Sequence, residues 1–189
     1  MKISIKALLA SFILTLFISF LFLKWSDKAR PAFAENRIQF LDKLEKEGAP
    51  DLAMTDLAGK TVNIKELKGK VVILNFWASW CAPCLEEFPS MVKLFDKFNK
   101  DIVILAVSQD SDRSDIDAFL KAFKNFDKPG IFLIHDKDKK IGSAFEVDRL
   151  PESFIFGPTG KMVKKIVGSI SWYSEDSSLY IKSLLSNEK

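Results

Sequence analysis

The sequence has few of the residues that metal and haem sites need. It contains two cysteines, Cys81 and Cys84, and one histidine, His135. A structural zinc site takes four ligands, and covalent haem attachment takes a histidine directly after the second cysteine, where Leu85 stands. This inventory excludes both kinds of site, and we expect no bound metal.

Positive charge is scarce outside the N-terminus. The net charge is +3 at pH 7, but the first thirty residues hold five basic residues against one acid, Asp27. The rest of the chain is nearly neutral, with 23 basic and 24 acidic residues. Binding to a phosphate backbone depends on clustered lysine and arginine, and neither a basic stripe nor a base-stacking motif is present. We therefore expect no nucleic-acid partner.

The sequence also lacks internal repeats, low-complexity tracts and long linkers. Its 189 residues match one domain of roughly 100–200 residues, and 17 phenylalanines supply core material. We divide the chain into an N-terminal signal anchor over residues 1–30, a linker helix over 31–48 and a globular domain over 49–189.

A run of 17 residues without charge, 7–23, lies between Lys6 and Lys24, which is the layout of a signal sequence or signal anchor. Cleavage after Ala34 is the alternative, because residues 32–34 read Ala-Phe-Ala. We favour a retained anchor, since charged residues separate that sequence from the apolar run. Both interpretations direct the rest of the chain to export.

Hydrophobic periodicity predicts an α/β domain. We expect helices over 36–47, from Cys81 to about 98, and over 112–126, 140–145 and 175–185, and strands over 52–54, 61–64, 71–77, 102–107, 131–134, 153–156 and 162–167. The first two strands form a small hairpin and the last two an antiparallel pair. Residues 71–77 show no polar alternation, which is typical of a central strand covered on both faces. This order implies one mixed sheet.

The two cysteines are separated by two residues, where strand 71–77 gives way to a helix. A helix N-terminus favours the thiolate form of the first cysteine, Cys81. After an attacking thiolate forms a mixed disulfide, a second thiol within reach can release it. The spacing therefore indicates dithiol–disulfide exchange. An inert disulfide is the alternative, although so small a loop would constrain the unfolded chain little.

Residues 75–84, NFWASWCAPC, followed by Glu87-Phe88-Pro89, resemble the TlpA/ResA/CcmG group of thioredoxin-like proteins. The resemblance extends over 49–170 and includes the segments 49–51, 56–60, 67–72 and 150–154. It implies a thioredoxin-like fold, in which helices flank a mixed central sheet, with an N-terminal β-hairpin and a signal anchor helix ahead of it.

The resemblance also implies roles for single residues. Cys81 would be the attacking thiol and Cys84 the resolving thiol. Pro151 would be a cis-proline beside the disulfide, where the backbone at Leu150 docks an extended substrate. Glu152 matches a glutamate of the cytochrome-maturation subset, so we expect it to contact partners.

Glu87 lies one helical turn after Cys84, where the family has a functional glutamate. A carboxylate there could exchange a proton with Cys84, and burial would raise its pKa toward neutrality. Complementing the helix N-terminus is the alternative role for acids in a first turn, and we favour it for Glu86.

The remaining motif residues are assigned by their position. Asn75 stands where cytoplasmic thioredoxins carry an aspartate, and we expect it to satisfy buried backbone groups. Trp77 is expected in the core beneath the site. Trp80, with Ala82 and Pro83, is expected to form the rim on which a partner docks.

The resemblance implies an enzyme that takes electrons from a membrane thiol reductase and reduces a disulfide in an extracytoplasmic protein, such as apocytochrome c. It would act in the bacterial periplasm or at the outer face of the cytoplasmic membrane, as a monomer whose only redox group is the Cys81–Cys84 disulfide. Two alternatives remain. A peroxiredoxin-like peroxidase would need a threonine where Ala78 stands, and a non-catalytic anchored module would only bind peptides.

Overall fold

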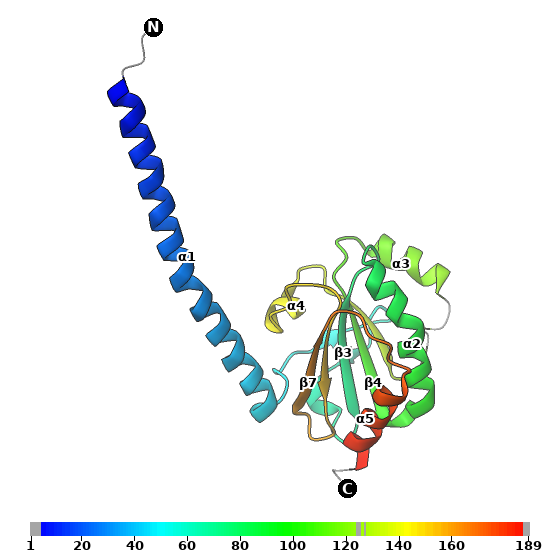
Figure 1. Ribbon diagram of the computed structural model, residues 1–189. Coiled ribbons are helices and arrows are strands. Elements are labelled where there is room, and N and C mark those ends of the chain that lie inside the picture. The colour runs from blue at the N-terminus through cyan, green and yellow to red at the C-terminus, as the bar shows by residue number, and fades with distance from the viewer. Residues whose placement is uncertain (1–4, 124–125, 127, 187–189) are drawn as a thin grey trace. The chain divides into compact units, whose positions relative to one another are not determined.

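The computed structural model describes residues 5–123, 126 and 128–186, and the chain divides into two compact units, residues 1–42 and 43–189. Helix α1 runs from Ile5 to Glu47 (Figure 1), so its residues 5–42 belong to the first unit and its residues 43–47 to the second. The separate helix expected over 36–47 is the last part of α1, because residues 24–35 contain many good helix formers and continue the helix. Within the described residues, none of the helices combines the length and apolar character that a membrane crossing needs.

The second unit is built on a five-stranded mixed sheet with the order β5-β4-β3-β6-β7. Strands β4 and β5 run parallel to β3, whereas β6 pairs antiparallel with β3, and β7 with β6. All seven residues of β3 are buried, which confirms the expected central strand. The strands are β3 (Val71–Trp77), β4 (Ile102–Ser108), β5 (Ile131–His135), β6 (Glu152–Phe156) and β7 (Met162–Val167).

The expected N-terminal hairpin is present, with shorter strands than predicted. β1 (Met54–Thr55) pairs antiparallel with β2 (Thr61–Val62), and a short 3-10 helix, η1 (Ile64–Glu66), follows. The Asp56 carboxylate accepts the backbone N–H groups of Ala58 and Lys60 and so closes the turn.

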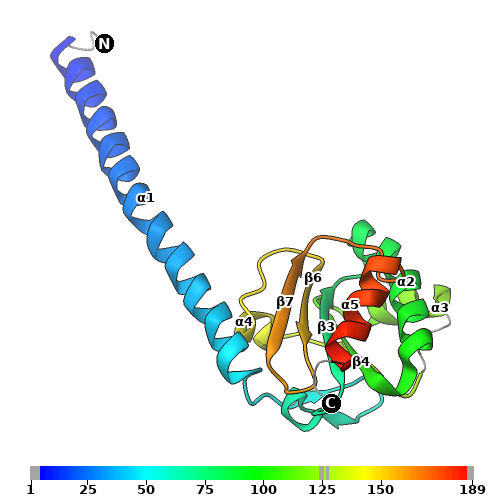
Figure 2. The ribbon, with the colours of Figure 1, turned by 60° about the horizontal axis from the view of Figure 1, so that its bottom comes forward.

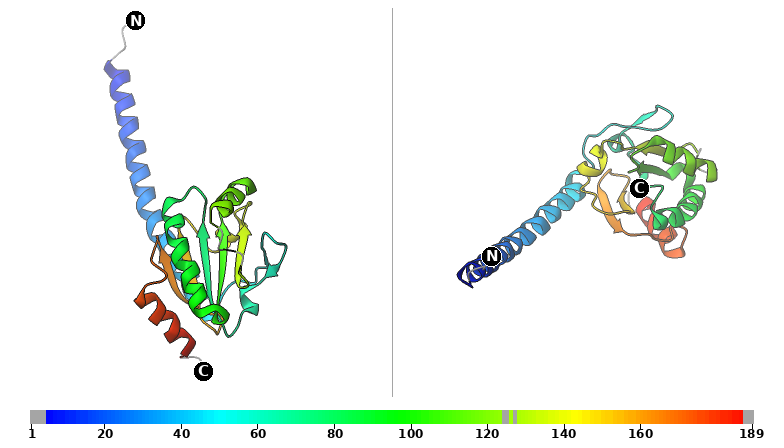
Figure 3. Two further views of the ribbon diagram at one scale, coloured as in Figure 1. Left: turned by 90° about the vertical axis from the view of Figure 1, so that its right-hand side faces the viewer. Right: turned by 90° about the horizontal axis from the view of Figure 1, so that it is seen from above.

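Helices α2 (Ala82–Phe98), α3 (Arg113–Ala122) and α5 (Glu175–Ser186) cover one face of the sheet, and the short α4 (Lys140–Ala144) lies on the other (Figures 1 and 2). Figure 3 shows α2 crossing in front of the strands. A second 3-10 helix, η2 (Asn99–Asp101), joins α2 to β4. The last helix matches its expected bounds within one residue.

Helix α3 is shorter than predicted. It ends at Ala122, where the sequence pattern indicated a helix to residue 126. Phe123 has an extended backbone, and Phe126 is buried outside the helix with its ring 4.9 Å from that of Phe88. Packing of Phe126 against α2 thus replaces the last helical turn, while positions 124, 125 and 127 lie outside the described residues.

Aromatic side chains fill both faces of the sheet. On the α2 side, the Trp77 ring lies 4.8 Å from Phe88 and 4.7 Å from Phe119. On the α4 side, Phe76 packs against Phe145 and Phe154. Because alternate residues of β3 enter opposite faces, Trp77 lies beneath α2 as expected, and it fixes the end of the strand from which Cys81 is reached.

Candidate active site

The cysteine pair lies at the junction of β3 and α2. After Trp77 the chain turns through residues 78–80, and the Cys81 N–H donates to the Ala78 carbonyl at 3.1 Å. Cys81 is the N-cap of α2 and has an extended backbone, with φ −89° and ψ 94°. Its side chain is therefore at the helix N-terminus, where the unpaired N–H groups of the first turn favour a thiolate. Pro83 fits that turn because its missing N–H would have no helical partner.

Cys81 and Cys84 form a disulfide with an S–S distance of 1.99 Å and a Cα–Cα distance of 5.3 Å. The two sulfurs differ in accessibility. Cys81 is 6% exposed, whereas Cys84 is fully buried. Trp80, beside Cys81, is 70% exposed, and Ala82 and Pro83 are exposed as well. A partner that approaches this surface meets Cys81 first.

Glu87 is buried one turn beyond Cys84, with only 2% of its surface exposed. Its Oε1 accepts a hydrogen bond of 2.8 Å from the Asn75 Nδ2 group, and its Oε2 accepts one of 3.4 Å from the Ile170 N–H. Glu86, by contrast, is exposed. The structure therefore separates the two neighbouring acids in the way that the helical spacing predicts.

Burial raises the pKa of Glu87 from 4.5 to about 7. The Asn75 side chain, the Ile170 N–H and the Trp172 indole favour the charged form, so they oppose this effect and keep the pKa from rising further. Near pH 7 the carboxyl group can therefore both accept and donate a proton.

Asn75 corrects one expectation. We predicted that it would satisfy buried backbone groups, but its Nδ2 donates to two side chains, Glu87 at 2.8 Å and Ser153 Oγ at 2.9 Å. Ser153 faces Asn75 because β3 and β6 pair in that register. Asn75 thus connects the carboxylate behind the cysteines to the strand that follows Pro151.

The Leu150–Pro151 peptide bond is cis, as the resemblance implied for Pro151. In the β3–β6 pairing Phe76 faces Glu152, so Leu150 and Pro151 continue toward the end of β3 from which the cysteine turn departs. The Pro151 carbonyl accepts the Gly168 N–H at 2.9 Å. Two residues further on, Ile170 donates to Glu87, so the segment after β7 contacts both sides of the site.

Glu152 corrects a second expectation. We predicted that it would contact partners, but it is fully buried, and its Oε1 lies 3.0 Å from the Nζ of Lys165 on β7. Lys165 is itself 11% exposed, with its ammonium 4.8 Å from the centre of the Phe154 ring. In this conformation Glu152 belongs to a buried ion pair within the β6–β7 hairpin and not to the docking surface.

The comparison with protein families decides the identity of the fold and its chemistry. A family model described as AhpC/TSA matches residues 46–165, which is more than half of the chain. The chain belongs to the AhpC/TSA family. The match begins before the hairpin and ends within β7, so it includes the cysteine pair, Glu87 and Pro151.

Several curated relatives carry the name thiol-disulfide oxidoreductase ResA. A thiol-disulfide oxidoreductase ResA of Bacillus cereus is 40% identical over 121 residues, which cover 64% of this chain and 68% of the relative. The ResA protein of Bacillus subtilis is 34% identical over 129 residues, covering 67% and 69%. This AhpC/TSA family member is accordingly an enzyme of the thiol-disulfide oxidoreductase type.

Solved structures agree with the fold. A candidate thiol:disulfide interchange protein DsbE from Chlorobium tepidum superposes with a TM-score of 0.63 at 30% identity, covering 74% of this chain and 96% of that one. A thioredoxin family protein from the same organism gives a TM-score of 0.61 at 25% identity, again covering 74% and 96%. These matches show the mixed α/β thioredoxin-like fold that the resemblance implied.

One residue near the site was not predicted. Asp110 lies two residues after the end of β4, is fully buried, and accepts hydrogen bonds from Ser79 in the cysteine turn. A signal for it exists in the sequence, since the ends of parallel strands meet at one edge of a sheet, and Asp110 follows β4 as Ser79 follows β3. The sequence does not reveal whether the Asp110 side chain points into the protein, so the pattern is equally compatible with an exposed loop residue.

Proposed function

We propose that this oxidoreductase works as a reductant, passing two electrons from its Cys81–Cys84 dithiol to a disulfide in an extracytoplasmic protein, for example apocytochrome c during cytochrome c maturation. The observation that supports the mechanism most strongly is the asymmetry of the site, in which Cys81 keeps 6% exposure, Cys84 is fully buried and Glu87 is buried one turn beyond Cys84. The ResA names of the relatives support the reaction type.

In the proposed reaction the Cys81 thiolate attacks one sulfur of the partner disulfide. A mixed disulfide forms, and the other partner sulfur leaves as a thiolate and takes up a proton. Cys84 then attacks the Cys81 sulfur, which releases the second partner thiol and closes the Cys81–Cys84 disulfide. Two electrons leave the enzyme and reduce the partner. The Cys81–Cys84 disulfide of the structure is the oxidised form that these two reaction steps would produce.

Glu87 is proposed to take the proton from Cys84. A buried thiol needs help to ionise, because an apolar environment raises its pKa. Glu87 follows Cys84 on the same helix, and its pKa of about 7 suits a group that accepts a proton in one half of the cycle and returns it in the other. Asn75 orients the carboxylate with its 2.8 Å hydrogen bond.

The docking surface is proposed to combine Trp80, Ala82 and Pro83 with the backbone at Leu150. Trp80 offers a large exposed aromatic surface next to the attacking sulfur. The cis bond between Leu150 and Pro151 lies at the same end of the sheet as the cysteine turn, so an extended peptide could pair with the Leu150 main chain while its disulfide reaches Cys81.

We further propose that the N-terminal segment anchors the enzyme with its domain outside the cytoplasm, in the periplasm or at the outer membrane face. The uncharged run over 7–23 supports this, as do the large apolar side chains exposed on α1 between Phe12 and Trp25. Each turnover consumes two electrons, so a membrane thiol reductase is the proposed donor. We propose a monomer whose redox disulfide needs no further cofactor.

The experiment that tests this proposal uses Cys84→Ser in cell membranes. Attack by Cys81 survives in this variant but release does not, so it should accumulate mixed disulfides with the true partner. Cys81→Ser is the matched control and should trap little. Bands captured by Cys84→Ser, cleaved by reducing agent and identified as disulfide-containing exported proteins, support the proposal. Equal trapping by both variants, or none by either, contradicts it.

A further inference from the structure

Asp110 connects the end of β4 to the turn that precedes Cys81. Its Oδ1 and Oδ2 lie 3.1 and 3.0 Å from the Ser79 N–H group, and Oδ1 accepts the Ser79 hydroxyl at 2.8 Å. Oδ2 also accepts the Ser108 hydroxyl at 2.7 Å. Every one of these contacts needs an acceptor, which an ionised carboxylate supplies and a protonated acid supplies only in part.

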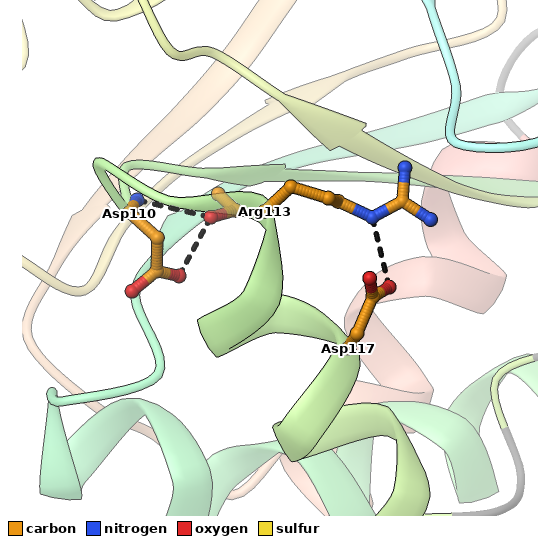
Figure 4. Close-up of polar contacts among 4 residues, drawn as sticks. Asp110, Arg113 and Asp117 are labelled. Carbon is orange, nitrogen blue, oxygen red and sulfur yellow. Dashed lines mark hydrogen bonds and ion pairs between the residues drawn. The ribbon is translucent and has the colours of Figure 1, made fainter.

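The backbone of Asp110 is also held in place by hydrogen bonds. The Asp110 N–H donates to the Ser108 Oγ at 3.0 Å, and the His135 Nε2 lies 3.0 Å from the Asp110 carbonyl oxygen. Figure 4 shows Asp110 and the nearby Arg113, whose guanidinium group pairs with Asp117 at 2.8 Å. Among the residues drawn there, Arg113 thus binds Asp117 and does not compete with Ser79 for the Asp110 carboxylate.

The turn is fixed on both sides of Ser79. Before it, the Gln109 N–H donates to the Trp77 carbonyl at 2.7 Å, and after it the Cys81 N–H donates to Ala78. Asp110 supplies the contact in the middle, two residues from the sulfur. The end of β4 thus determines where the chain leaves β3 and where α2 begins.

We propose that Asp110 is a positioning residue for Cys81. By clamping Ser79 it holds the 78–80 turn so that the Cys81 sulfur stays beside the N–H groups of the first turn of α2, which stabilise the thiolate. Asp110 has no contact with a reacting atom and is therefore not a catalytic residue. The inference rests on the proposed role of Cys81 as the attacking thiol.

A pure charge effect would predict the opposite behaviour. A buried negative charge near a thiol disfavours the thiolate, so removing it would make Cys81 more reactive. Positioning predicts that removal makes Cys81 less reactive. Ser79→Ala separates the two effects, because it deletes one contact to the carboxylate and leaves the charge unchanged.

Asp136 provides a matched control. It is a buried carboxylate that follows β5 as Asp110 follows β4, and it accepts the N–H groups of Ile141 and Gly142 and the Gln109 side-chain amide. Within the described residues, the hydrogen bonds of its carboxylate go to α4 and the Gln109 side chain and do not reach the cysteine turn. Asp136→Ala should lower global stability about as Asp110→Ala does without displacing Ser79.

The test measures iodoacetamide alkylation of Cys81 in the reduced protein between pH 5 and 9, read by mass spectrometry, for wild type, Ser79→Ala, Asp110→Ala and Asp136→Ala. We expect roughly threefold slower reaction at pH 7 in Ser79→Ala and roughly tenfold in Asp110→Ala, since contacts to a charged acceptor are lost. The apparent pKa of Cys81 should rise in both, while Asp136→Ala keeps the wild-type profile. If Asp110→Ala does not fold, the comparison of the Cys81 alkylation rates in Ser79→Ala and Asp136→Ala tests the positioning role.

Four results would overturn the inference. Faster alkylation in Asp110→Ala with an unchanged Ser79→Ala would show a charge effect. Equal slowing in Asp136→Ala would show a general loss of stability. If wild-type Cys81 is reactive but Ser79→Ala has the wild-type alkylation rate, only the positioning role is contradicted. If wild-type Cys81 is alkylated no faster than free cysteine, both the proposed function and the positioning role are contradicted.

Discussion

At the scale of single residues, the proposed proton transfer depends on the burial of the Glu87 carboxyl group. Glu87 is almost completely buried, yet its hydrogen bonds from Asn75 and Ile170 make its charged form accessible near neutral pH. A fully solvated glutamate would be ionised throughout this range and could not return a proton to Cys84. The buried position therefore has a chemical use that the exposed Glu86 could not provide.

Burial of Glu87 also makes stability depend on pH. The unfolded chain loses this proton near pH 4.5, whereas the folded protein keeps it until about pH 7. Stability therefore falls as pH rises through this window, by roughly 3 kcal/mol in total. Glu87→Gln removes the ionisation, so we expect the free energy of unfolding of the variant to exceed that of wild type by roughly 1–3 kcal/mol at pH 8 and to equal it at pH 4.5.

Urea unfolding of the oxidised proteins measures this difference in the free energy of unfolding. Glu86→Gln is the control, and an identical pH dependence in Glu87→Gln and wild type would refute the assignment.

The same substitution should alter catalysis. With Glu87→Gln the attack by Cys81 remains, but deprotonation of Cys84 lacks its base, so release of the mixed disulfide at pH 7 should slow by roughly 10- to 100-fold. Acid-quenched single turnovers resolve attack from release. The defect should shrink as the pH rises, because hydroxide can then deprotonate Cys84 without Glu87. Slowing of attack instead of release would assign Glu87 a different role.

The residue scale also shows what sequence could not reveal. Helical spacing and the family resemblance together selected Glu87 over Glu86, because the distance of Glu87 from Cys84 and its face of α2 follow from the helix. Glu152 needed the pairing of β6 with β7, which brings Lys165 from another strand beside it. A glutamate after a proline looks like a surface residue until its partner strand is in place.

At the scale of elements, the end of α1 is part of the globular unit. Leu44 and Ala49 are buried, and Gly48 sits between them with φ +86°, where its N–H donates to the Leu44 carbonyl at 3.0 Å. A side chain at Gly48 would place its Cβ 2.5 Å from the Gly160 carbonyl oxygen in the β6–β7 turn. The helix end and the hairpin are therefore in direct backbone contact.

This contact gives a matched pair of variants. Gly48 and Gly59 both have φ +86°, but an added Cβ at Gly59 meets nothing within 4 Å. Gly59→Ala should cost only the backbone term of about 1–2 kcal/mol, whereas Gly48→Ala should cost at least about 2 kcal/mol more through the clash. Thermal or urea unfolding compares them. Equal losses would mean that the helix end does not rest on the β6–β7 turn.

The elements themselves were largely predictable. Residues 71–77 and 102–107 read as buried strands because both faces of a central parallel pair are covered, and the structure confirms both. The end of α3 was not predictable, since Phe123 and Phe126 continue the apolar spacing of the helix while tertiary packing draws Phe126 onto α2. Local periodicity does not distinguish a further helical turn from such a contact.

At the scale of the whole molecule, the chain combines a long N-terminal helix with a complete thioredoxin-like unit. The chain divides into its two compact units between Asp42 and Lys43, and Leu44 is buried. The oxidoreductase chemistry lies entirely in the second unit. Under the proposed anchoring, the first unit determines only where that chemistry takes place.

Removal of the N-terminal segment should therefore change location and leave the chemistry intact. A variant that begins at Glu35 should lose membrane association in cell fractionation, while Cys81 keeps the alkylation rate of the full chain. Intact mass of the protein extracted from membranes separates anchoring from cleavage. A mass that includes residues 1–34 supports the anchor, and a chain beginning at Glu35 would contradict it.

The most direct measurement mixes reduced enzyme with a disulfide-bonded peptide, quenches with acid, and follows the products by mass spectrometry for wild type, Cys84→Ser and Cys81→Ser. We predict that wild type passes through a short-lived adduct to the Cys81–Cys84 disulfide with two peptide thiols released, that Cys84→Ser stops at a mixed disulfide on Cys81, and that Cys81→Ser forms almost none. Adducts that form as readily on Cys84 as on Cys81, or a wild-type rate no higher than that of free cysteine, would contradict an exchange that starts at Cys81 and ends at the fully buried Cys84.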